Sequence, residues 1–450
     1  MLPQTPPGLR TRPWTPAPHP HIVPTQYLRS GQVSGGQGDR WAAHHQTEDP
    51  PHASSLLQEV QGAVEPGNNA GLRSDGVPSG PSHPDEKGDL AMLEDVYRKL
   101  ARQLDAIPNG FPPTESGVEL RLLAKLFTPE EAGLASSMRL APDPAADIAA
   151  RAGVDAEEAY RLLKRMASKG LIESQTAEGQ RVFALRPFIV GFYESQLPRM
   201  DNELAALFEK YYLDSSGAIL RDSPPLHRVI PVGEAIPFEI DIFPYERASE
   251  LLEGAKSWGV RKCICRVQQR LVGRGCDRPV EACLVFAPVE GAFDHSDLDR
   301  AITKEEALRI LRDAEEAGLV HSASNYRKGI DYICNCCTCC CGIMRGIAEF
   351  GISTAVAHSD FHAVIDAELC IGCGDCIDRC LFGALSVPDN VAVLDYARCM
   401  GCGQCAVACT LDALHLERRP AGEVQLPPAD VNEWMAKRIE IRGIARSDVS

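Results

Sequence analysis

The sequence predicts a multidomain α+β protein. Helix-spaced apolar residues run from Met92 to about residue 212, and short β-prone segments alternate with helices after that point. All 18 cysteines lie between Cys263 and Cys409, so the two halves of the chain differ in chemistry. The chain has 450 residues, which at roughly 100–200 residues per domain is enough for several domains.

Residues 1–88 are rich in Pro, Gly, Ser and His and have no apolar periodicity. Such a composition cannot bury a core, so we expect this segment to be disordered. An alternative is that it is an N-terminal extension outside the natural protein, because patterned sequence begins only at Met92.

The charge balance limits the kinds of partner that we expect the protein to bind. The net charge is −16, which argues against broad contact with nucleic acid or anionic membranes and favours docking on a basic protein. No apolar run is long enough to span a bilayer. The N-terminus lacks a basic region followed by an apolar one, so we expect a cytoplasmic protein.

Residues 89–200 predict a helical domain. Thr128, Pro129 and Glu131 form a helix start with a capping box. We expect Asp143 and Pro144 to begin a short helix, and Asp155 to cap the next one. That second helix has a buried stripe, formed by Ala159, Leu162, Leu163 and Met166.

Two β-prone segments follow, around Ile172 and at Val182–Leu185. Helix, turn, helix and hairpin together resemble a winged-helix domain, which implies possible phosphate contacts from the second helix and the wing. These contacts would come from Arg161, Lys164, Arg165, Lys169, Arg181 and Arg186. However, residues 89–200 hold 14 basic and 16 acidic side chains, whereas DNA-binding modules are usually basic. Docking or dimerisation is the competing interpretation.

Residues 201–350 predict a cysteine-rich α/β domain, preceded by an amphipathic helix over 187–212. Strands are expected at 228–232, 238–243, 259–267 and 283–289. Thr303 and Glu306 cap a helix that starts at Lys304. We expect residues 421–450 to form a polar tail with one short helix near Val431–Ile439.

The segments that begin at Cys370 and Cys399 repeat one pattern, C-x2-C-x2-C-x3-C, with 29 positions between their first cysteines. Glycines follow the cysteines at Gly372, Gly374, Gly401 and Gly403, where they permit positive φ and a close approach of the backbone. A short strand precedes each segment and another follows it. Zinc ribbons use C-x2-C pairs instead of such triplets with a remote fourth cysteine.

This pattern resembles the bacterial ferredoxin that carries two [4Fe–4S] clusters, over a domain at residues 351–420. The resemblance implies that the fourth cysteine of each repeat binds the other cluster. The first cluster would be held by Cys370, Cys373, Cys376 and Cys409, and the second by Cys399, Cys402, Cys405 and Cys380. The family usually has proline after the fourth cysteine, where this chain has Leu381 and Thr410.

Ten further cysteines form a second candidate metal set: Cys263, Cys265, Cys276, Cys283, Cys334, Cys336, Cys337, Cys339, Cys340 and Cys341. Thiols this dense bind metal or oxidise. On one strand, Cys263 and Cys265 would point to the same face and share a metal. Three interpretations stay open: a third Fe–S cluster, a zinc site, or a redox or structural thiol group.

The leading functional hypothesis is electron transfer through two [4Fe–4S] clusters to a protein partner. One alternative is a redox-sensing winged-helix regulator that binds DNA. Another is an oxidoreductase whose cysteine-rich active site is fed by the ferredoxin module, so whether the chain is an enzyme stays open. We find no glycine fingerprint for a dinucleotide, no P-loop and no nucleophile elbow.

Overall fold

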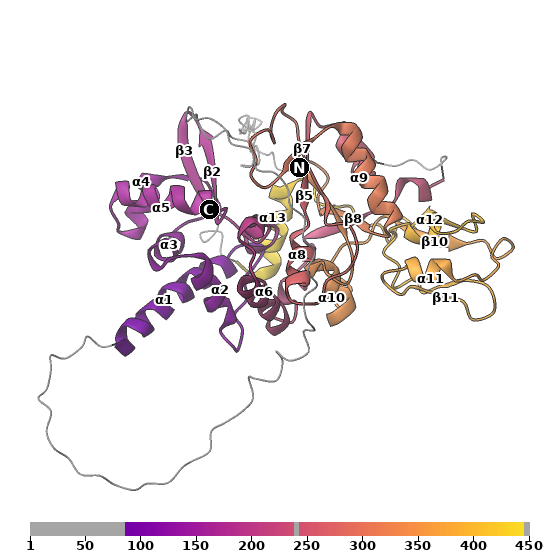
Figure 1. Cartoon of the computed structure of the whole chain (residues 1–450), viewed down its shortest axis with the longest axis horizontal. Helices are drawn as coiled ribbons and strands as arrows, with labels where there is room; N and C mark the ends of the chain where they lie inside the picture. Colours follow the sequence, from indigo (N-terminus) through magenta and orange to yellow (C-terminus); the bar gives the residue numbers. More distant parts are fainter. Residues whose placement is uncertain (1–85, 238–242, 445–450) are drawn as a thin grey trace, which may run out of the picture. The chain divides into compact units, whose positions relative to one another are not determined.

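In the computed structural model, which describes residues 86–237 and 243–444, a six-stranded antiparallel sheet carries the cysteine-rich region (Figure 1). Its strand order is β4-β8-β9-β6-β5-β7. The strands are β4 (His227–Ile230), β5 (Ser257–Lys262), β6 (Glu281–Ala287), β7 (Arg300–Ile302), β8 (Val320–Ser324) and β9 (Tyr332–Cys336). The expected N-terminal segment at 1–88 and the expected strand at 238–243 lie largely outside the described residues.

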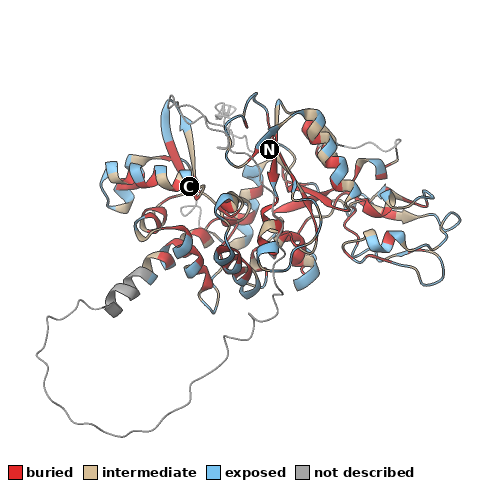
Figure 2. Cartoon of the chain, in the orientation of Figure 1, coloured by how far each residue is buried: buried red, intermediate tan, exposed pale blue. Residues whose placement is uncertain are grey.

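Strand alternation divides this sheet into two chemically different faces. One face is apolar and packs against α7 (Ala248–Glu253) and α9 (Lys304–Glu316), through residues such as Leu284 and Ile333. Their neighbours Cys283 and Cys334 therefore point to the opposite face. Thr303 caps α9 by accepting a hydrogen bond from the Glu306 amide, as expected. Every residue of β4 and β8 is buried (Figure 2).

Two helices follow strands of the sheet, and a cysteine is the N-cap of each. Helix α8 (Ile264–Leu271) has Cys263 as its N-cap, and α10 (Gly342–Phe350) has Cys341. The predicted strand over 259–267 is therefore wrong after Lys262, because the chain turns into α8 there. Cys263 and Cys265 lie on a helix start instead of one face of a strand.

The N-terminal part is helical with a small sheet, and it contains α1 (Glu86–Asp105), α2 (Val118–Leu126), α3 (Pro129–Ala135), α4 (Ala145–Ala152), α5 (Ala156–Ser168), β1 (Asp143–Pro144), β2 (Ile172–Ala177) and β3 (Gln180–Leu185). The strands pair in the order β1-β3-β2. The Thr128 capping box, the Asp155 cap and the buried stripe of α5 are as expected.

Two expectations for this part are wrong. Asp143 does not start α4; it lies in β1 and binds Arg139 and Arg151, so Pro144 takes the cap position. The single helix expected over 187–212 is broken into η2 (Phe188–Phe192), η3 (Glu194–Arg199) and α6 (Asn202–Asp214). Pro198 lies within η3, and Asp201 caps α6 anew.

The C-terminal part holds two strand pairs and two short helices. Strand β10 (Phe361–Ile365) pairs with β13 (Leu414–Arg418), and β11 (Leu385–Ser386) pairs with β12 (Val393–Leu394). The helices are α11 (Asp375–Arg379) and α12 (Gln404–Val407).

The short helix expected in the C-terminal tail is present as α13 (Val431–Arg442), which extends beyond the expected end at Ile439 and whose Arg438 is fully buried. The described elements from Leu90 onward belong to one compact unit, and the domain boundaries at 200, 350 and 420 stay predictions. Short 3-10 turns complete the chain at η4 (Ala218–Leu220), η5 (Gly233–Ala235) and η6 (Pro244–Glu246). None of the described helices has the length and apolar character needed to cross a bilayer.

Candidate metal centres

The eight cysteines of the two repeats gather into two sets. Cys376 interacts electrostatically with Cys373, Cys370 and Cys409. Cys405 interacts in the same way with Cys402, Cys399 and Cys380. In each set the fourth cysteine comes from the other repeat. We call Cys370, Cys373, Cys376 and Cys409 the outer set, and Cys380, Cys399, Cys402 and Cys405 the inner set.

The fourth cysteine of each repeat follows a short helix. Cys380 is the C-cap of α11, and Cys409 follows α12 after Ala408. The third cysteine lies within each of these helices, and the helix ends by directing the fourth cysteine to the other set.

The surroundings of both sets fit an anionic cluster. The amide of Ala392 donates to Cys370 Sγ at 3.3 Å, and the amide of Ala384 donates to Cys380 Sγ at 3.2 Å. A cavity of about 20 Å³ lies among the four inner cysteines, with walls that include Phe382, Leu394 and Met400. Burial raises the pKa of Cys402 to about 12, so the sulfur needs a metal in place of the proton to bear negative charge there.

The loop glycines have the expected conformation. Gly401 has φ of 67°, and a Cβ atom there would lie 2.1 Å from the carbonyl oxygen of Phe361. Only glycine fits this position, because any side chain would push the cysteine loop away from β10.

The inner set faces the cysteine-rich region and the outer set faces solvent. The amide of Val232 donates to the Cys402 carbonyl at 3.0 Å, and the buried Gln404 donates to the Leu319 carbonyl at 2.7 Å. Leu381, directly after Cys380, packs against the buried group that contains Cys337 and Cys340. In the outer set, Cys373 is exposed and Ile371 is 68% exposed.

The structure divides the second candidate set into two groups. The four-thiol group consists of Cys276, Cys337, Cys339 and Cys340, whose sulfurs all lie within 4.8 Å of one another. The remaining thiols form a closed ring of pairwise side-chain interactions in the order Cys263, Cys265, Cys341, Cys336, Cys334 and Cys283. We call these the six-thiol ring. The cysteine spacing gave no sign of this division, because both groups draw on the same stretch, Cys334–Cys341.

One arginine, Arg266, interacts with thiols of both groups. Arg266 is fully buried, and its guanidinium donates to the carbonyls of Pro279 and Asn335. It interacts electrostatically with Cys263, Cys283 and Cys336 of the ring and with Cys337 of the four-thiol group, and its Nε has no hydrogen-bond partner. Hydrogen bonds from Cys265 and Cys283, together with this charge, hold the pKa of Cys263 well below its usual value.

A chain of hydrogen bonds ends on the six-thiol ring. Ser324 donates to the Tyr332 hydroxyl at 2.9 Å, which lies 2.8 Å from His227 Nε2. Burial lowers the pKa of His227 to about 4, so the imidazole is neutral and this arrangement places its proton on Nδ1. Nδ1 lies 3.3 Å from Ser322 Oγ, which lies 3.7 Å from Cys336 Sγ. These contacts form a continuous polar chain from Ser324 to the Cys336 sulfur.

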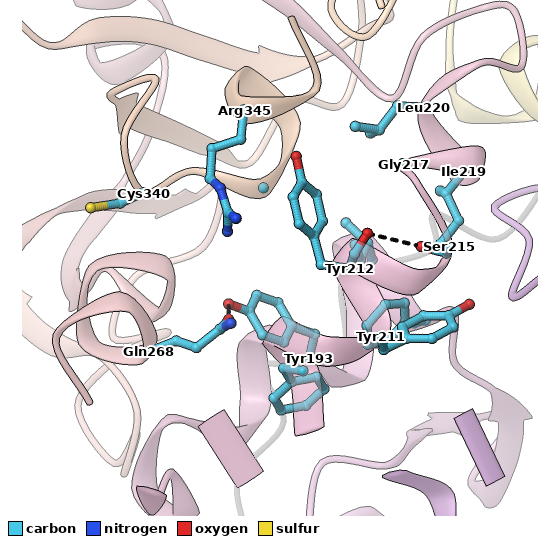
Figure 3. A pocket seen from close by; sticks show the side chains of 14 residues that line it. Tyr193, Tyr211, Tyr212, Ser215, Gly217, Ile219, Leu220, Gln268, Cys340 and Arg345 are labelled. Atoms are coloured by element: carbon cyan, nitrogen blue, oxygen red, sulfur yellow. Dashed lines mark hydrogen bonds between the residues drawn. The ribbon is translucent and has the colours of Figure 1, made fainter. Parts of the chain in front are cut away.

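A pocket borders the four-thiol group. Aromatic rings line it, including Tyr193, Tyr211 and Tyr212, and Cys340 lies at its edge (Figure 3). The guanidinium of Arg345 lies 4.3 Å from the centre of the Tyr212 ring and pairs with Glu209 at 2.7 Å. The cavity volume of this pocket is about 50 Å³. This is enough for a few waters at roughly 10–15 Å³ each, and too small for a flavin or nicotinamide.

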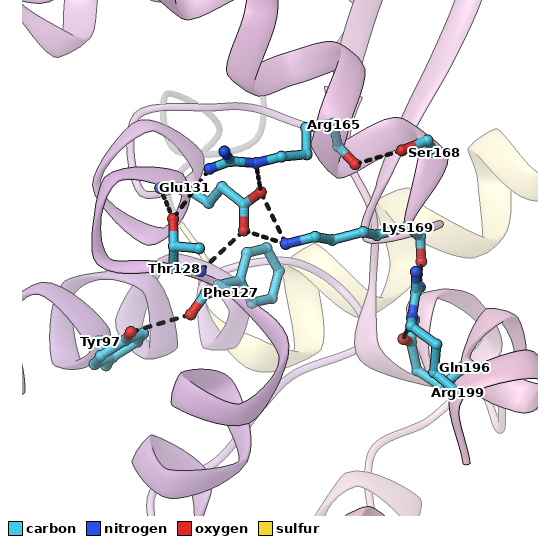
Figure 4. Close-up of polar contacts among 9 residues, drawn as sticks. All are labelled: Tyr97, Phe127, Thr128, Glu131, Arg165, Ser168, Lys169, Gln196 and Arg199. Atoms are coloured by element: carbon cyan, nitrogen blue, oxygen red, sulfur yellow. Dashed lines mark hydrogen bonds and ion pairs between the residues drawn. The ribbon is translucent and has the colours of Figure 1, made fainter.

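Two basic residues of α5 and its basic C-cap pair with acidic neighbours. Buried Glu131 pairs with Arg165 at 2.5 Å and with Lys169 at 2.6 Å (Figure 4). Arg161 pairs with Glu158 at 2.5 Å. These charges stabilise the helical part itself, because the same Glu131 also closes the capping box with Thr128.

The strand–cysteine-loop–helix repeats define the C-terminal part as an iron–sulfur module. Residues 362–410 match the family model of the 4Fe-4S dicluster domain. The module therefore binds at least one [4Fe–4S] cluster, and a general iron–sulfur electron-transfer role follows from it. No curated protein and no solved structure matches the chain.

Proposed function

We propose that the protein is an electron relay that takes electrons at an exposed [4Fe–4S] cluster on the outer set and passes them through a second cluster on the inner set into the cysteine-rich region. The observation that carries this proposal is the position of the inner set. Its loop at Cys380–Leu381 packs on the four-thiol group, whereas the outer set keeps Cys373 and Ile371 at the surface.

A basic redox protein is the proposed partner of the outer cluster. Exposed carboxylates surround the outer cysteine loop, namely Asp366, Glu368, Asp375, Asp378 and Asp389. Complementary charge steers such encounters and leaves an apolar contact at their centre. Ile371 and Leu369, which are 68% and 49% exposed, supply that contact.

The six-thiol ring is the proposed destination, as a third iron–sulfur centre. The Ser322 hydroxyl supports a thiolate at Cys336, and the Arg266 charge supports those at Cys263 and Cys283. Helices α8 and α10 add the partial positive charge of their N-termini, where Cys263 and Cys341 are the first residues. Such contacts with ligand sulfurs set cluster potentials.

The metal content and spin count of protein purified without oxygen test the relay. We expect two reduced [4Fe–4S] signals per chain, plus iron beyond the about eight atoms that two such clusters contain. Cys373→Ser should remove only the outer signal, Cys402→Ser only the inner one, and Cys334→Ser only the additional iron. A single cluster in the wild type would refute the relay.

We propose that the helical part docks proteins instead of reading DNA, because Arg161, Arg165 and Lys169 already pair with carboxylates within the domain. A gel-shift titration with the gene's own upstream DNA, in reduced and air-exposed protein, tests this. Specific retardation in either state would overturn it and favour the regulator hypothesis.

A further inference from the structure

The four-thiol group has a geometry unlike that of the other cysteines. Cys340 Sγ lies 3.7 Å from Cys276 Sγ and 3.8 Å from Cys339 Sγ. Among the described residues, it is the one group of potential ligands whose atoms all approach within 4.8 Å. The outer and inner sets do not form such a group.

These distances match a single tetrahedral ion. With metal–sulfur bonds of about 2.3 Å, the sulfurs of a tetrahedral site lie about 3.8 Å apart. In a cubane, iron and sulfide ions lie between the thiolates, so the thiolate sulfurs are farther apart than they are around a single ion. The group therefore suits one ion and has no room for a cluster.

The surroundings suit a charged site that is closed on one side. Cys337 and Cys340 are 1% and 2% exposed, whereas Cys276 and Cys339 lie nearer the surface. Two guanidinium groups offset the negative charge of a tetrathiolate: Arg278 lies 3.7 Å from Cys339 Sγ, and Arg266 interacts electrostatically with Cys337. Four protein thiolates leave no open position, which is typical of a structural zinc site.

We propose that Cys276, Cys337, Cys339 and Cys340 bind one zinc ion. The ion fixes the residues against which the inner cluster loop, Cys380–Leu381, packs. Without the ion, Cys276 contacts the β9–α10 connection through its thiol, which lies 3.7 Å from Cys340 Sγ. With it, the loop after α8 and that connection are tied together beneath Leu381.

A second contact joins the iron–sulfur module to the region around the four-thiol group. Arg379, directly before Cys380, donates to the carbonyls of Glu315 at 3.0 Å and Glu316 at 2.7 Å. Arg278 reaches the next carbonyl, that of Ala317, at 3.4 Å. The zinc site and the inner cluster loop thus share the end of α9 as their support.

Elemental analysis of the anaerobically purified full chain tests the proposal. We expect one zinc per chain in the wild type and a loss of at least ten-fold in Cys339→Ser, with both [4Fe–4S] signals retained. The matched control is Cys373→Ser, which should lose iron and keep its zinc. Because zinc and iron are counted separately, failure of the relay and failure of this site are distinguishable.

Cobalt gives a second readout, whose main observation is made on the wild type and therefore does not require a variant to fold. Protein produced with Co²⁺ in place of zinc should show the ligand-field and sulfur-to-cobalt absorption bands of a tetrahedral tetrathiolate, and Cys276→Ser should weaken them. An unchanged zinc content in Cys339→Ser would overturn the proposal. So would a wild type whose four-thiol group holds iron, visible as a high-spin ferric signal that Cys339→Ser abolishes.

Discussion

At the scale of single residues, buried polar side chains tune the thiol chemistry. His227 is 3% exposed, and it connects Tyr332 to Ser322 while remaining neutral. An uncharged ring is needed here, because a protonated one would have to surrender the hydrogen bond it accepts at Nε2.

This imidazole gives the fold a pH dependence of known sign. Burial lowers the pKa of His227 from 6.5 to about 4, so its contribution to stability is complete above pH 6.5 and is lost as pH falls toward 4. The loss is on the order of 3 kcal/mol. His227→Gln should reduce the pH dependence of the urea midpoint between those pH values. Equal slopes in wild type and His227→Gln would contradict this.

Ser322 should tune the proposed third centre. Ser322→Ala removes the donor to Cys336 Sγ, which makes the sulfur more electron-rich and lowers the reduction potential of a bound cluster. The free energy of unfolding should fall by about 1 kcal/mol. A potentiometric titration followed by EPR measures the first effect. Ser324→Ala, at the far end of the chain, should have a smaller effect, and equal effects would argue against the donor chain.

At the scale of elements, the cysteine loops depend on backbone shape. Gly401 combines a positive φ with a carbonyl at the place a Cβ atom would take. The loop therefore holds its cysteines against β10 only if that position lacks a side chain.

Gly401→Ala should displace Cys399 and Cys402 and release the inner cluster, so that about four of the irons expected for two clusters are lost. Iron and sulfide analysis measures this. Gly422→Ala is the matched control, because a Cβ atom there meets nothing within 4 Å. Full iron content in Gly401→Ala would show that the loop adapts.

At the scale of the whole molecule, α13 joins distant parts of the chain. Buried Arg438 donates to the carbonyls of Pro108, Asp222 and Pro224 at 2.7 to 2.8 Å. Trp434 donates to the carbonyl of Pro225 at 2.9 Å. The last described helix thus holds the connection after α1 against the segment that leads into β4.

Arg438→Met should leave these carbonyls without donors and lower the free energy of unfolding by about 3 kcal/mol or more. Lys437→Met, which breaks only an exposed pair with Glu433, should cost less than about 1 kcal/mol. Urea denaturation without oxygen compares the two. Similar losses of stability in the two variants would mean that α13 does not hold these parts of the chain together.

The sequence by itself determined what depends on local spacing. The Thr128 and Asp155 caps, the stripe of α5, the glycine loops and the two cysteine repeats are all set by residues a few positions apart. The dicluster match at 362–410 agrees with the repeats. Local hydrogen bonding and chain geometry fix these features before any long-range packing.

Only the tertiary structure decided which of the remaining thiols lie together. Cys336 and Cys337 are neighbours in sequence, yet β9 directs the first into the six-thiol ring and the following turn directs the second into the four-thiol group. Cys276 joins that group from 61 positions away. Strand pairing and the packing of α8 and α10 set these positions, and such long-range contacts leave no period or spacing in the sequence.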